Sequence, residues 1–220
     1  MDATLISQEL KEEIGRRGII AVLEIDDLET AVPVAEALMR GGVSEIELTL
    51  RTPCAVEAIS EIVRNVPGML VGAGTVIRED QIGQALDAGA SFGFAPGFNP
   101  RVVKKAKAVG FPFAPGVSTA SELEGAVELG CDVLKLYPAE ILGGLRYLNS
   151  LAGPYSYLGL KYIPLGGMTL ESMPAWAGSD RVLAIGGSWI AKRAIVKARD
   201  YALIEKNARE AVAAWKAARG

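Results

Sequence analysis

The sequence predicts an α/β fold, a (β/α)8 barrel with one helix before it and one helix after it. Short apolar segments alternate along the chain with segments whose apolar residues recur at helical spacing. Such alternation is typical of a parallel sheet covered by helices. Eight strand–helix units within 220 residues favour a closed barrel, which commonly forms one domain of this size. We therefore expect a single barrel domain over residues 1–220.

The first half of the chain supports this order of elements. Residues 2–17 have apolar positions at helical spacing and end between Gly15 and Gly18, which predicts a helix. After a strand at 19–23, we expect Asp26 and Asp27 to cap a helix that ends at Gly41 and Gly42. The next predicted elements are a strand at 45–50, a helix at 53–66, a strand beginning at 70 and a helix at 79–88.

The second half repeats one short pattern, a helix end followed by a glycine and then a strand. It occurs around Gly89, Gly110 and Gly130, at a spacing of about twenty residues that is typical of successive α/β units. We then expect strands at 131–138, 160–165 and 181–185, helices at 144–151 and 170–177, and a final helix at 202–218 on the barrel wall.

Composition excludes several classes of function. A formal net charge of −3 gives no electrostatic reason to expect nucleic acid or an anionic membrane as a partner, and no apolar run is long enough to span a bilayer. Two cysteines and no signal peptide suggest a cytoplasmic protein. The absence of histidine excludes Ser-His-Asp and Cys-His nucleophiles and argues against zinc. We therefore expect neither a metal nor a cofactor.

One apolar strand contains a lysine. Lys135 lies between Leu134 and Leu136 in the strand predicted at 131–138. A buried ammonium is unfavourable unless it is paired, and burial favours the neutral amine, which can add to a carbonyl and form a Schiff base. The alternative is a lysine whose stem is buried while its head reaches water. Taken alone, this strand favours a lysine whose head reaches water. The residues at the ends of the other strands favour a nucleophilic lysine.

Charged residues alternate along the strand predicted at 45–50. Glu45, Glu47, Thr49 and Arg51 share one face, which in a barrel points toward the interior or its mouth. Glu47 is a candidate proton shuttle, and Arg51 is a candidate anchor for a carboxylate, which suits the guanidinium fork. The alternative is a structural ion pair between Glu47 and Arg51, and the pattern favours neither interpretation.

Glycine pairs follow the last two predicted strands. In barrels this position commonly binds phosphate through backbone N–H groups, because glycine lets the backbone approach an anion closely. Gly166–Gly167 and Gly186–Gly187–Ser188 therefore predict a phosphate site, in preference to tight turns alone.

Four segments together resemble the 2-keto-3-deoxy-6-phosphogluconate (KDPG) / 4-hydroxy-2-oxoglutarate (KHG) aldolases. They are Glu47-Leu-Thr-Leu-Arg-Thr, Gly72-Ala-Gly-Thr-Val, Lys135-Leu-Tyr-Pro-Ala-Glu and Ile185-Gly-Gly-Ser-Trp. The resemblance runs from about Gly18 to Trp189 and into the tail. It implies a class I (Schiff-base) pyruvate aldolase, an aldehyde-lyase of carbohydrate metabolism, on a (β/α)8 barrel that assembles as a homotrimer.

The resemblance also implies a role for each site residue. Lys135 would be the Schiff-base lysine and Glu47 the general acid/base. The carboxylate of a small 2-oxo acid substrate would bind Arg51 and Thr75. Pro96 and Tyr137 would line the pocket. The distal phosphate would bind Gly166, Gly167, Gly187 and Ser188.

Three residues depart from the family pattern, namely Leu165 in place of Thr, Glu24 in place of Arg and Ala95 in place of Ser. They leave the choice of aldehyde open. Two other functions are compatible with the same barrel. A phosphosugar isomerase or synthase is disfavoured by the lysine between two leucines. A non-catalytic metabolite-binding barrel is disfavoured by the intact Glu47, Arg51 and Lys135.

Overall fold

The strands of the protein form two parallel sheets. A computed structural model describes residues 4–219. One sheet has six strands in the order β5-β4-β3-β2-β1-β9, and the other has three in the order β6-β7-β8. The strands are β1 (Ile19–Leu23), β2 (Glu45–Thr49), β3 (Leu70–Gly74), β4 (Phe92–Phe94), β5 (Phe113–Ala114), β6 (Gly116–Val117), β7 (Val133–Leu136), β8 (Lys161–Pro164) and β9 (Ile185–Gly187). Their parallel pairing confirms the predicted α/β class.

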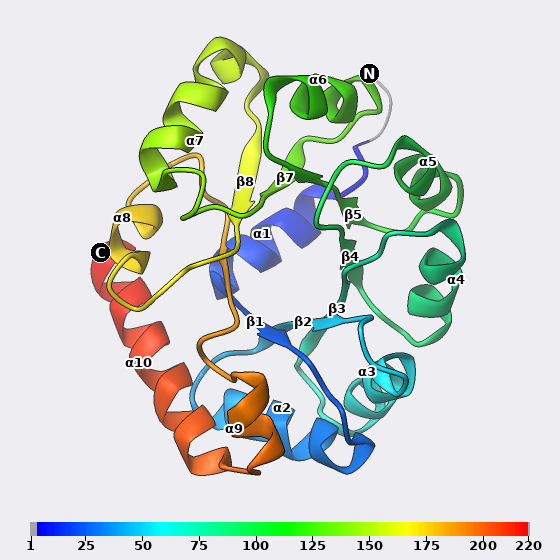
Figure 1. Ribbon diagram of the computed structural model, residues 1–220, viewed down its shortest axis with the longest axis vertical. Coiled ribbons are helices and arrows are strands. Elements are labelled where there is room, and N and C mark those ends of the chain that lie inside the picture. Colours follow the sequence, from blue (N-terminus) through cyan, green and yellow to red (C-terminus); the bar gives the residue numbers. More distant parts are fainter. Residues whose placement is uncertain (1–3, 220) are drawn as a thin grey trace.

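The two sheets meet at both of their edges. β5 and β6 are separated only by Pro115, whose carbonyl accepts a hydrogen bond from the Lys135 N–H of β7 at 2.9 Å. At the other edge, Tyr162 of β8 pairs in parallel with Val182 through a single bridge. Figure 1 accordingly shows the strands arranged around a ring with helices outside it.

The strand count differs from the predicted eight, because the described residues contain nine strands. The chain after Pro115 pairs again as β6, which lies beyond the strand expected after Gly110. The strand predicted at 181–185 begins only at Ile185, since the segment before it makes no more than the bridge to Tyr162. The strand predicted at 131–138 is shorter, covering Val133–Leu136.

The helices cover the outside of the ring. They are α1 (Gln8–Arg17), α2 (Ala31–Arg40), α3 (Ala55–Asn65), α4 (Glu79–Asp87), α5 (Pro100–Ala108), α6 (Ala120–Glu128), α7 (Gly144–Ala152), α8 (Met173–Ala177), α9 (Arg193–Lys197) and α10 (Tyr201–Arg219), with 3-10 turns η1 (Leu28–Thr30) and η2 (Gly153–Leu158). The short α9 has no counterpart among the predicted elements. Among the described residues, none of the helices combines the length and apolar character needed to cross a membrane.

Two predicted helix starts differ from the structure. The first helix begins at Gln8 because Ser7 caps it, accepting a hydrogen bond from the Leu10 N–H; the predicted start at residue 2 lies outside the described residues. Asp27 does act as a cap, but it caps the turn η1, and α2 begins only at Ala31.

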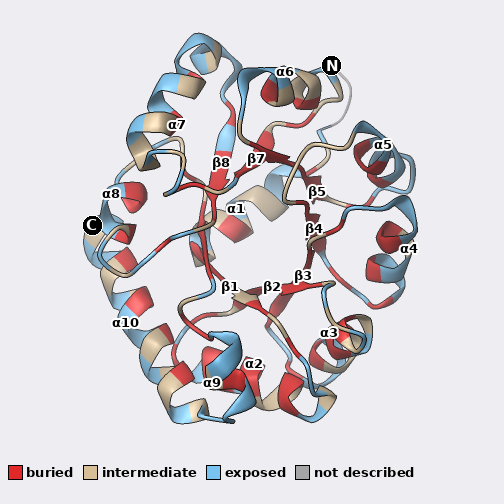
Figure 2. Ribbon diagram, in the orientation of Figure 1, coloured by how far each residue is buried: buried red, intermediate tan, exposed pale blue. Residues whose placement is uncertain are grey.

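Helix α1 closes one end of the ring. Figure 1 shows it lying across the ring, whereas the other helices lie around the outside. Ile6 and Ile14 pack with inward-facing strand residues such as Ile20, Phe92 and Ile163. Figure 2 shows the strands almost entirely buried, while each outer helix has one buried side. The opposite end, where the strands terminate, is therefore the end at which side chains can meet a ligand.

Candidate active site

A cavity of about 330 Å³ lies at the carboxyl ends of the strands. Every predicted site residue except Gly187 lines it. The lining residues are Val22, Glu24, Glu47, Thr49, Arg51, Thr75, Pro96, Lys135, Tyr137, Leu165, Gly166, Gly167, Gly186 and Ser188. Side chains that are far apart in the sequence are thus brought together as predicted.

Lys135 and Glu47 form a buried ion pair in this cavity. The Lys135 Nζ donates a hydrogen bond to Glu47 Oε1 at 2.9 Å, and the two side chains are only 5% and 1% exposed. The other carboxylate oxygen of Glu47 is buried and has no hydrogen-bond partner. The lysine Nζ also lies 5.9 Å from the ring centre of Phe94 and 5.5 Å from that of Tyr137. A carboxylate in direct contact with a dry ammonium can take its proton, which leaves a neutral amine.

A glycine on the neighbouring strand makes room for Glu47. β3 pairs with β2 so that Gly74 lies opposite Thr49, two residues beyond Glu47. A Cβ atom on Gly74 would collide with the carboxylate and with Cγ of Glu47. The glycine therefore lets the carboxylate lie against β3 while it reaches Lys135.

Thr75 has a strained backbone at the edge of the cavity. Its φ is 57°, a region that is unfavourable for a β-branched residue. The residues beside it are held by hydrogen bonds, Gly74 O accepting from Leu50 N at 2.8 Å and Val76 N donating to Phe94 O at 3.1 Å. Such strain persists only where the surroundings impose it, and it is common in binding sites.

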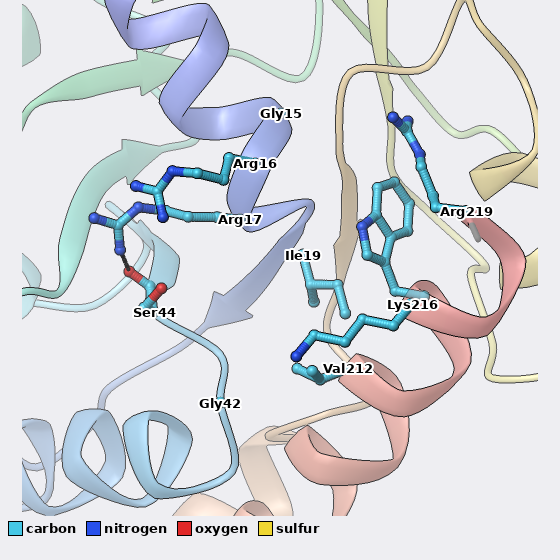
Figure 3. Close-up of a pocket in the computed structure, with 10 residues that line it drawn as sticks. Gly15, Arg16, Arg17, Ile19, Gly42, Ser44, Val212, Lys216 and Arg219 are labelled. Carbon is cyan, nitrogen blue, oxygen red and sulfur yellow. Dashed lines mark hydrogen bonds between the residues drawn. The ribbon is translucent and has the colours of Figure 1, made fainter.

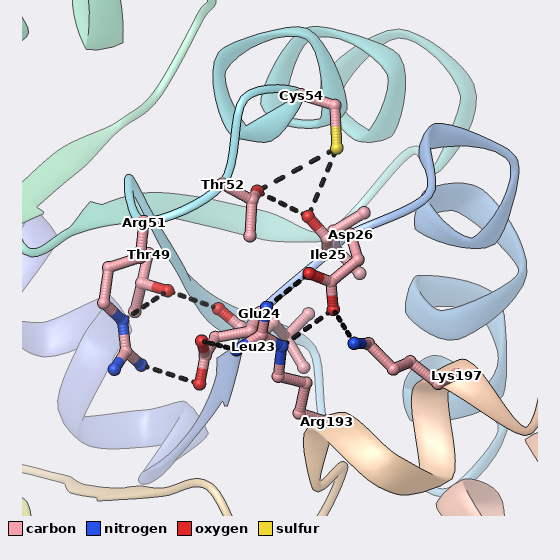
Figure 4. A network of polar contacts seen from close by, with 10 residues as sticks. All are labelled: Leu23, Glu24, Ile25, Asp26, Thr49, Arg51, Thr52, Cys54, Arg193 and Lys197. Carbon is pink, nitrogen blue, oxygen red and sulfur yellow. Dashed lines mark hydrogen bonds and ion pairs between the residues drawn. The ribbon is translucent and has the colours of Figure 1, made fainter.

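Arg51 is paired with Glu24, which also lines the cavity. Its Nη2 lies 3.1 Å from Glu24 Oε1, and its Nε donates to Thr49 Oγ1 at 3.2 Å. The second oxygen of Glu24 lies 3.4 Å from Arg193 Nη1. Figure 4 shows this chain of contacts continuing to Asp26, whose pKa is lowered to about 2 by its hydrogen bonds with Arg193. The guanidinium of Arg51 thus lines the cavity with its Nε and Nη2 groups already engaged.

The loop after β8 contains two glycines with left-handed backbone conformations. Gly166 has φ 94° and Gly167 has φ 80°, values that side chains rarely tolerate. The loop is bound to the end of β7, because Ala139 N donates to Leu165 O at 2.7 Å. The side chain of Leu165 packs directly on the backbone of Gly186.

Gly187 was predicted to line the cavity, but it does not. Side chains alternate along a strand, and Ala184 belongs to the inner core, so Gly186 faces the cavity and Gly187 faces away. The ring of Trp189 occupies the space where a Cβ on Gly187 would lie. The predicted phosphate loop included both glycines, but the resemblance gave the role to Gly187, because the glycine pair alone does not reveal which of its members points inward.

Other cavity residues escaped the prediction as well. Thr49 was placed on the same strand face as Glu47 but was given no role in the site. Val22 carries no polar group, and nothing in its local sequence distinguishes it from the core.

A larger cavity, of about 600 Å³, lies elsewhere, between α1, α10 and the loop that precedes β2 (Figure 3). Its half-buried cation, Arg17, already donates to the carbonyls of Ser44 at 2.6 Å and Gly68 at 3.0 Å, so this arginine joins two backbone segments. None of its lining residues is a carboxylate that could act with a lysine. Within residues 4–219, no group of three His, Cys, Asp or Glu side chains is arranged to hold a metal ion. The smaller cavity is therefore the candidate active site.

Comparison with known proteins identifies the family. The model of the family "KDPG and KHG aldolase" matches residues 10–207. The 2-dehydro-3-deoxy-phosphogluconate aldolase of Dickeya dadantii is 42% identical over 195 residues, which is 89% of this chain and 91% of that protein.

Solved structures agree with this match. The Zymomonas mobilis 2-keto-3-deoxy-6-phosphogluconate aldolase with 3-phosphoglycerate has a TM-score of 0.84 and 38% identity, over 93% of this chain and 96% of that one. A Legionella pneumophila KDPG aldolase, with pyruvate captured as a covalent carbinolamine, has a TM-score of 0.83 and 32% identity, over 89% and 96% of the two chains. The chain therefore belongs to the KDPG and KHG aldolase family.

Proposed function

We propose that this aldolase cleaves a 2-oxo-4-hydroxy acid by a Schiff-base mechanism. The substrate is KDPG, KHG or both, and the products are pyruvate and either glyceraldehyde 3-phosphate or glyoxylate. The observation that carries the proposal is the ion pair of Lys135 and Glu47, dry and 2.9 Å apart within the cavity. The covalent carbinolamine in the Legionella relative supports the same chemistry.

In the first step, Glu47 accepts the ammonium proton of Lys135, and the neutral amine attacks C2 of the substrate. Glu47 then gives this proton to the departing hydroxyl, so that loss of water from the carbinolamine leaves an iminium ion and restores the carboxylate of Glu47. Covalent catalysis of this kind divides one difficult bond cleavage into easier steps.

In the second step, the C3–C4 bond breaks. A carboxylate, for which Glu47 is the candidate, takes the proton of the C4 hydroxyl, and the electrons of the bond move onto the iminium to form an enamine. The aldehyde leaves, Glu47 returns a proton to C3, and water hydrolyses the iminium to release pyruvate. The iminium formed with Lys135 provides the electron sink, so this mechanism needs neither metal nor cofactor.

The remaining cavity residues divide between the two ends of the substrate. Arg51 binds the carboxylate next to the ketone with its free guanidinium donors, and Thr75 adds a hydroxyl. Pro96 and Tyr137 bound the middle of the cavity. Gly166, Gly167 and Ser188 are candidates for the distal phosphate or carboxylate, together with Gly186, which lines the cavity where Gly187 was expected.

We also propose how the chain is organised. The two sheets act as one closed (β/α)8 barrel, a proposal supported by their junctions at Pro115 and at the Tyr162–Val182 bridge. Residues 1–220 then act as one domain in a homotrimer, as the resemblance implies, and the low cysteine content is consistent with a cytoplasmic protein. Sedimentation equilibrium would test the trimer.

The function is tested by incubating the protein with a panel of 2-oxo-4-hydroxy acids and measuring pyruvate release. We expect release from KDPG or KHG. Failure to release pyruvate from any member of the panel, by a folded protein, would contradict the proposal.

A further inference from the structure

Glu140 contacts three parts of the structure. It lies in the turn between β7 and α7, five residues after Lys135. Its Oε1 accepts a hydrogen bond from the indole N–H of Trp176 at 2.6 Å. Its backbone N–H donates to the carbonyl of Gly166 at 3.0 Å. One residue therefore connects the end of the lysine strand, the glycine loop after β8 and the helix α8.

The contact with the glycine loop is close. A Cβ atom on Gly167 would lie only 2.8 Å from the Cβ of Glu140, and one on Gly166 would lie 2.9 Å from the Cα of Pro138. The loop is thus laid directly against the turn that contains Glu140. Because both glycines have positive φ and no side chain of their own to pack, contacts from outside must hold their backbone in place.

The Trp176 bond fixes Glu140 from the opposite side. Trp176 is 1% exposed in α8, so its ring is held by the core and its N–H has a defined direction. Within residues 4–219, no lysine or arginine forms an ion pair with Glu140, and the indole is the only side-chain donor to its carboxylate. A hydrogen bond to a charged group is among the stronger single contacts in a protein.

We propose that Glu140, held by Trp176, is a positioning residue that sets the place of the Gly166–Gly167 loop and hence affinity for the aldehyde end of the substrate. The proposal rests on the function proposed above, in which this loop binds the distal group. Glu140 does not line the cavity, so it acts through the loop and not on the reacting atoms. The pyruvate end of the site, with Lys135, Glu47 and Arg51, does not depend on it.

The test compares two reactions in the variants Glu140→Ala and Trp176→Phe. Cleavage of the whole 2-oxo-4-hydroxy acid needs the loop, whereas exchange of the methyl protons of pyruvate with deuterium needs only the pyruvate end. We expect KM for the whole acid to rise about ten-fold or more in either variant, as for loss of one charge-assisted hydrogen bond. Pyruvate exchange should stay within about two-fold of the wild type.

Two further variants separate positioning from general stability. Glu140→Gln keeps an oxygen that can accept from Trp176, so it should restore most of the affinity. In the double variant Glu140→Ala/Trp176→Phe, KM should be no higher than in the more affected single variant, because both changes break the same bond. Tyr155→Phe is the matched control, since it removes a similar 2.6 Å bond to Glu124, and neither residue lines the cavity.

A measurement that needs no substrate tests the positioning role of Glu140 independently of the proposed function. Amide hydrogen exchange in the peptide that contains Gly166 and Gly167 should be faster in Glu140→Ala, while the peptide that contains Lys135 should be unchanged. Unchanged exchange in the glycine peptide would overturn the positioning role, as would an equal loss of cleavage and pyruvate exchange. A wild-type protein that forms no pyruvyl adduct on Lys135 would instead refute the proposed function, and the amide exchange would still decide the role of Glu140.

Discussion

Lys135 donates a hydrogen bond to Glu47 across the interior of the barrel at 2.9 Å, although 88 positions separate them in the sequence. Within residues 4–219, neither forms an ion pair with any other residue, and both are almost completely buried. Removing one member of such a pair leaves an unpaired charge in a dry site, which typically costs about 3–5 kcal/mol. Variants at either position must therefore be checked for folding before their activity is interpreted.

Glu47→Gln should form the pyruvyl adduct but turn over slowly. A positioned acid/base typically contributes about 10²–10⁴-fold to the rate, and the amide cannot carry the proton. The amine of Lys135 is retained in this variant, so trapping of pyruvate by borohydride should persist. Turnover close to that of the wild type, in a protein with an unchanged circular dichroism spectrum, would contradict the role of Glu47.

Glu45→Gln should stabilise the protein near neutral pH. Glu45 lies on the same strand face as Glu47, is completely buried, and both of its carboxyl oxygens lack hydrogen-bond partners. Its burial raises the pKa well above the ordinary 4.5, an effect that nearby Arg17 only partly opposes. The folded protein therefore binds this proton more tightly than the unfolded chain. The stabilisation contributed by protonated Glu45 is fully present below pH 4.5, the pKa in the unfolded chain. It is lost as the pH rises through the higher pKa of Glu45 in the folded protein.

This difference is measured by urea denaturation between pH 5 and pH 8. Within the window, the wild-type free energy of unfolding should fall by up to about 1.4 kcal/mol per pH unit from this one group. Glu45→Gln should lack that component, whereas Glu36→Gln, at an exposed helical position, should retain it. Parallel pH profiles of Glu45→Gln and the wild type would show that Glu45 is not protonated in the folded state.

Leu165→Thr should favour the phosphorylated substrate. Leu165 lines the cavity and covers Gly186, but the backbone of the glycine loops remains available to an anion. We expect measurable cleavage of KDPG by the wild type. A threonine hydroxyl near the phosphate should then raise kcat/KM for KDPG relative to KHG by about 10–100-fold, as for one hydrogen bond to a charged group. If the wild type ignores KDPG and Leu165→Thr does not restore cleavage, the proposed phosphate site is wrong.

The sequence was sufficient to identify the parts of the site that lie on strands. The position of Lys135 in an apolar strand and the alternation of Glu47, Thr49 and Arg51 both follow from local periodicity. Local pattern could not decide which charges pair. The sequence was equally compatible with an ion pair between Glu47 and Arg51. In the structure, Glu47 pairs with Lys135 and Arg51 pairs with Glu24. These partners come from three different strands, and only the closed arrangement of the strands brings them together.

The elements that differ from prediction are those defined by tertiary contacts. β6 has two residues, and its pairing with β7 cannot be read from so short a segment. The inward direction of Gly186 depends on the register of β9 with β1, in which it lies opposite Ile20. The bond between Glu140 and Trp176 joins residues 36 positions apart, and neither residue has a local pattern that indicates it.

The most direct test of the account is to trap pyruvate on the protein with borohydride and to locate the adduct by mass spectrometry. In the wild type, we predict a reduced pyruvyl group on the peptide that contains Lys135. Lys135→Ala and Lys135→Arg should gain no adduct and should release no pyruvate, because a guanidinium stays protonated and cannot add to a ketone. An adduct on another lysine, or cleavage that survives in Lys135→Arg, would contradict the assignment of Lys135 as the Schiff-base residue.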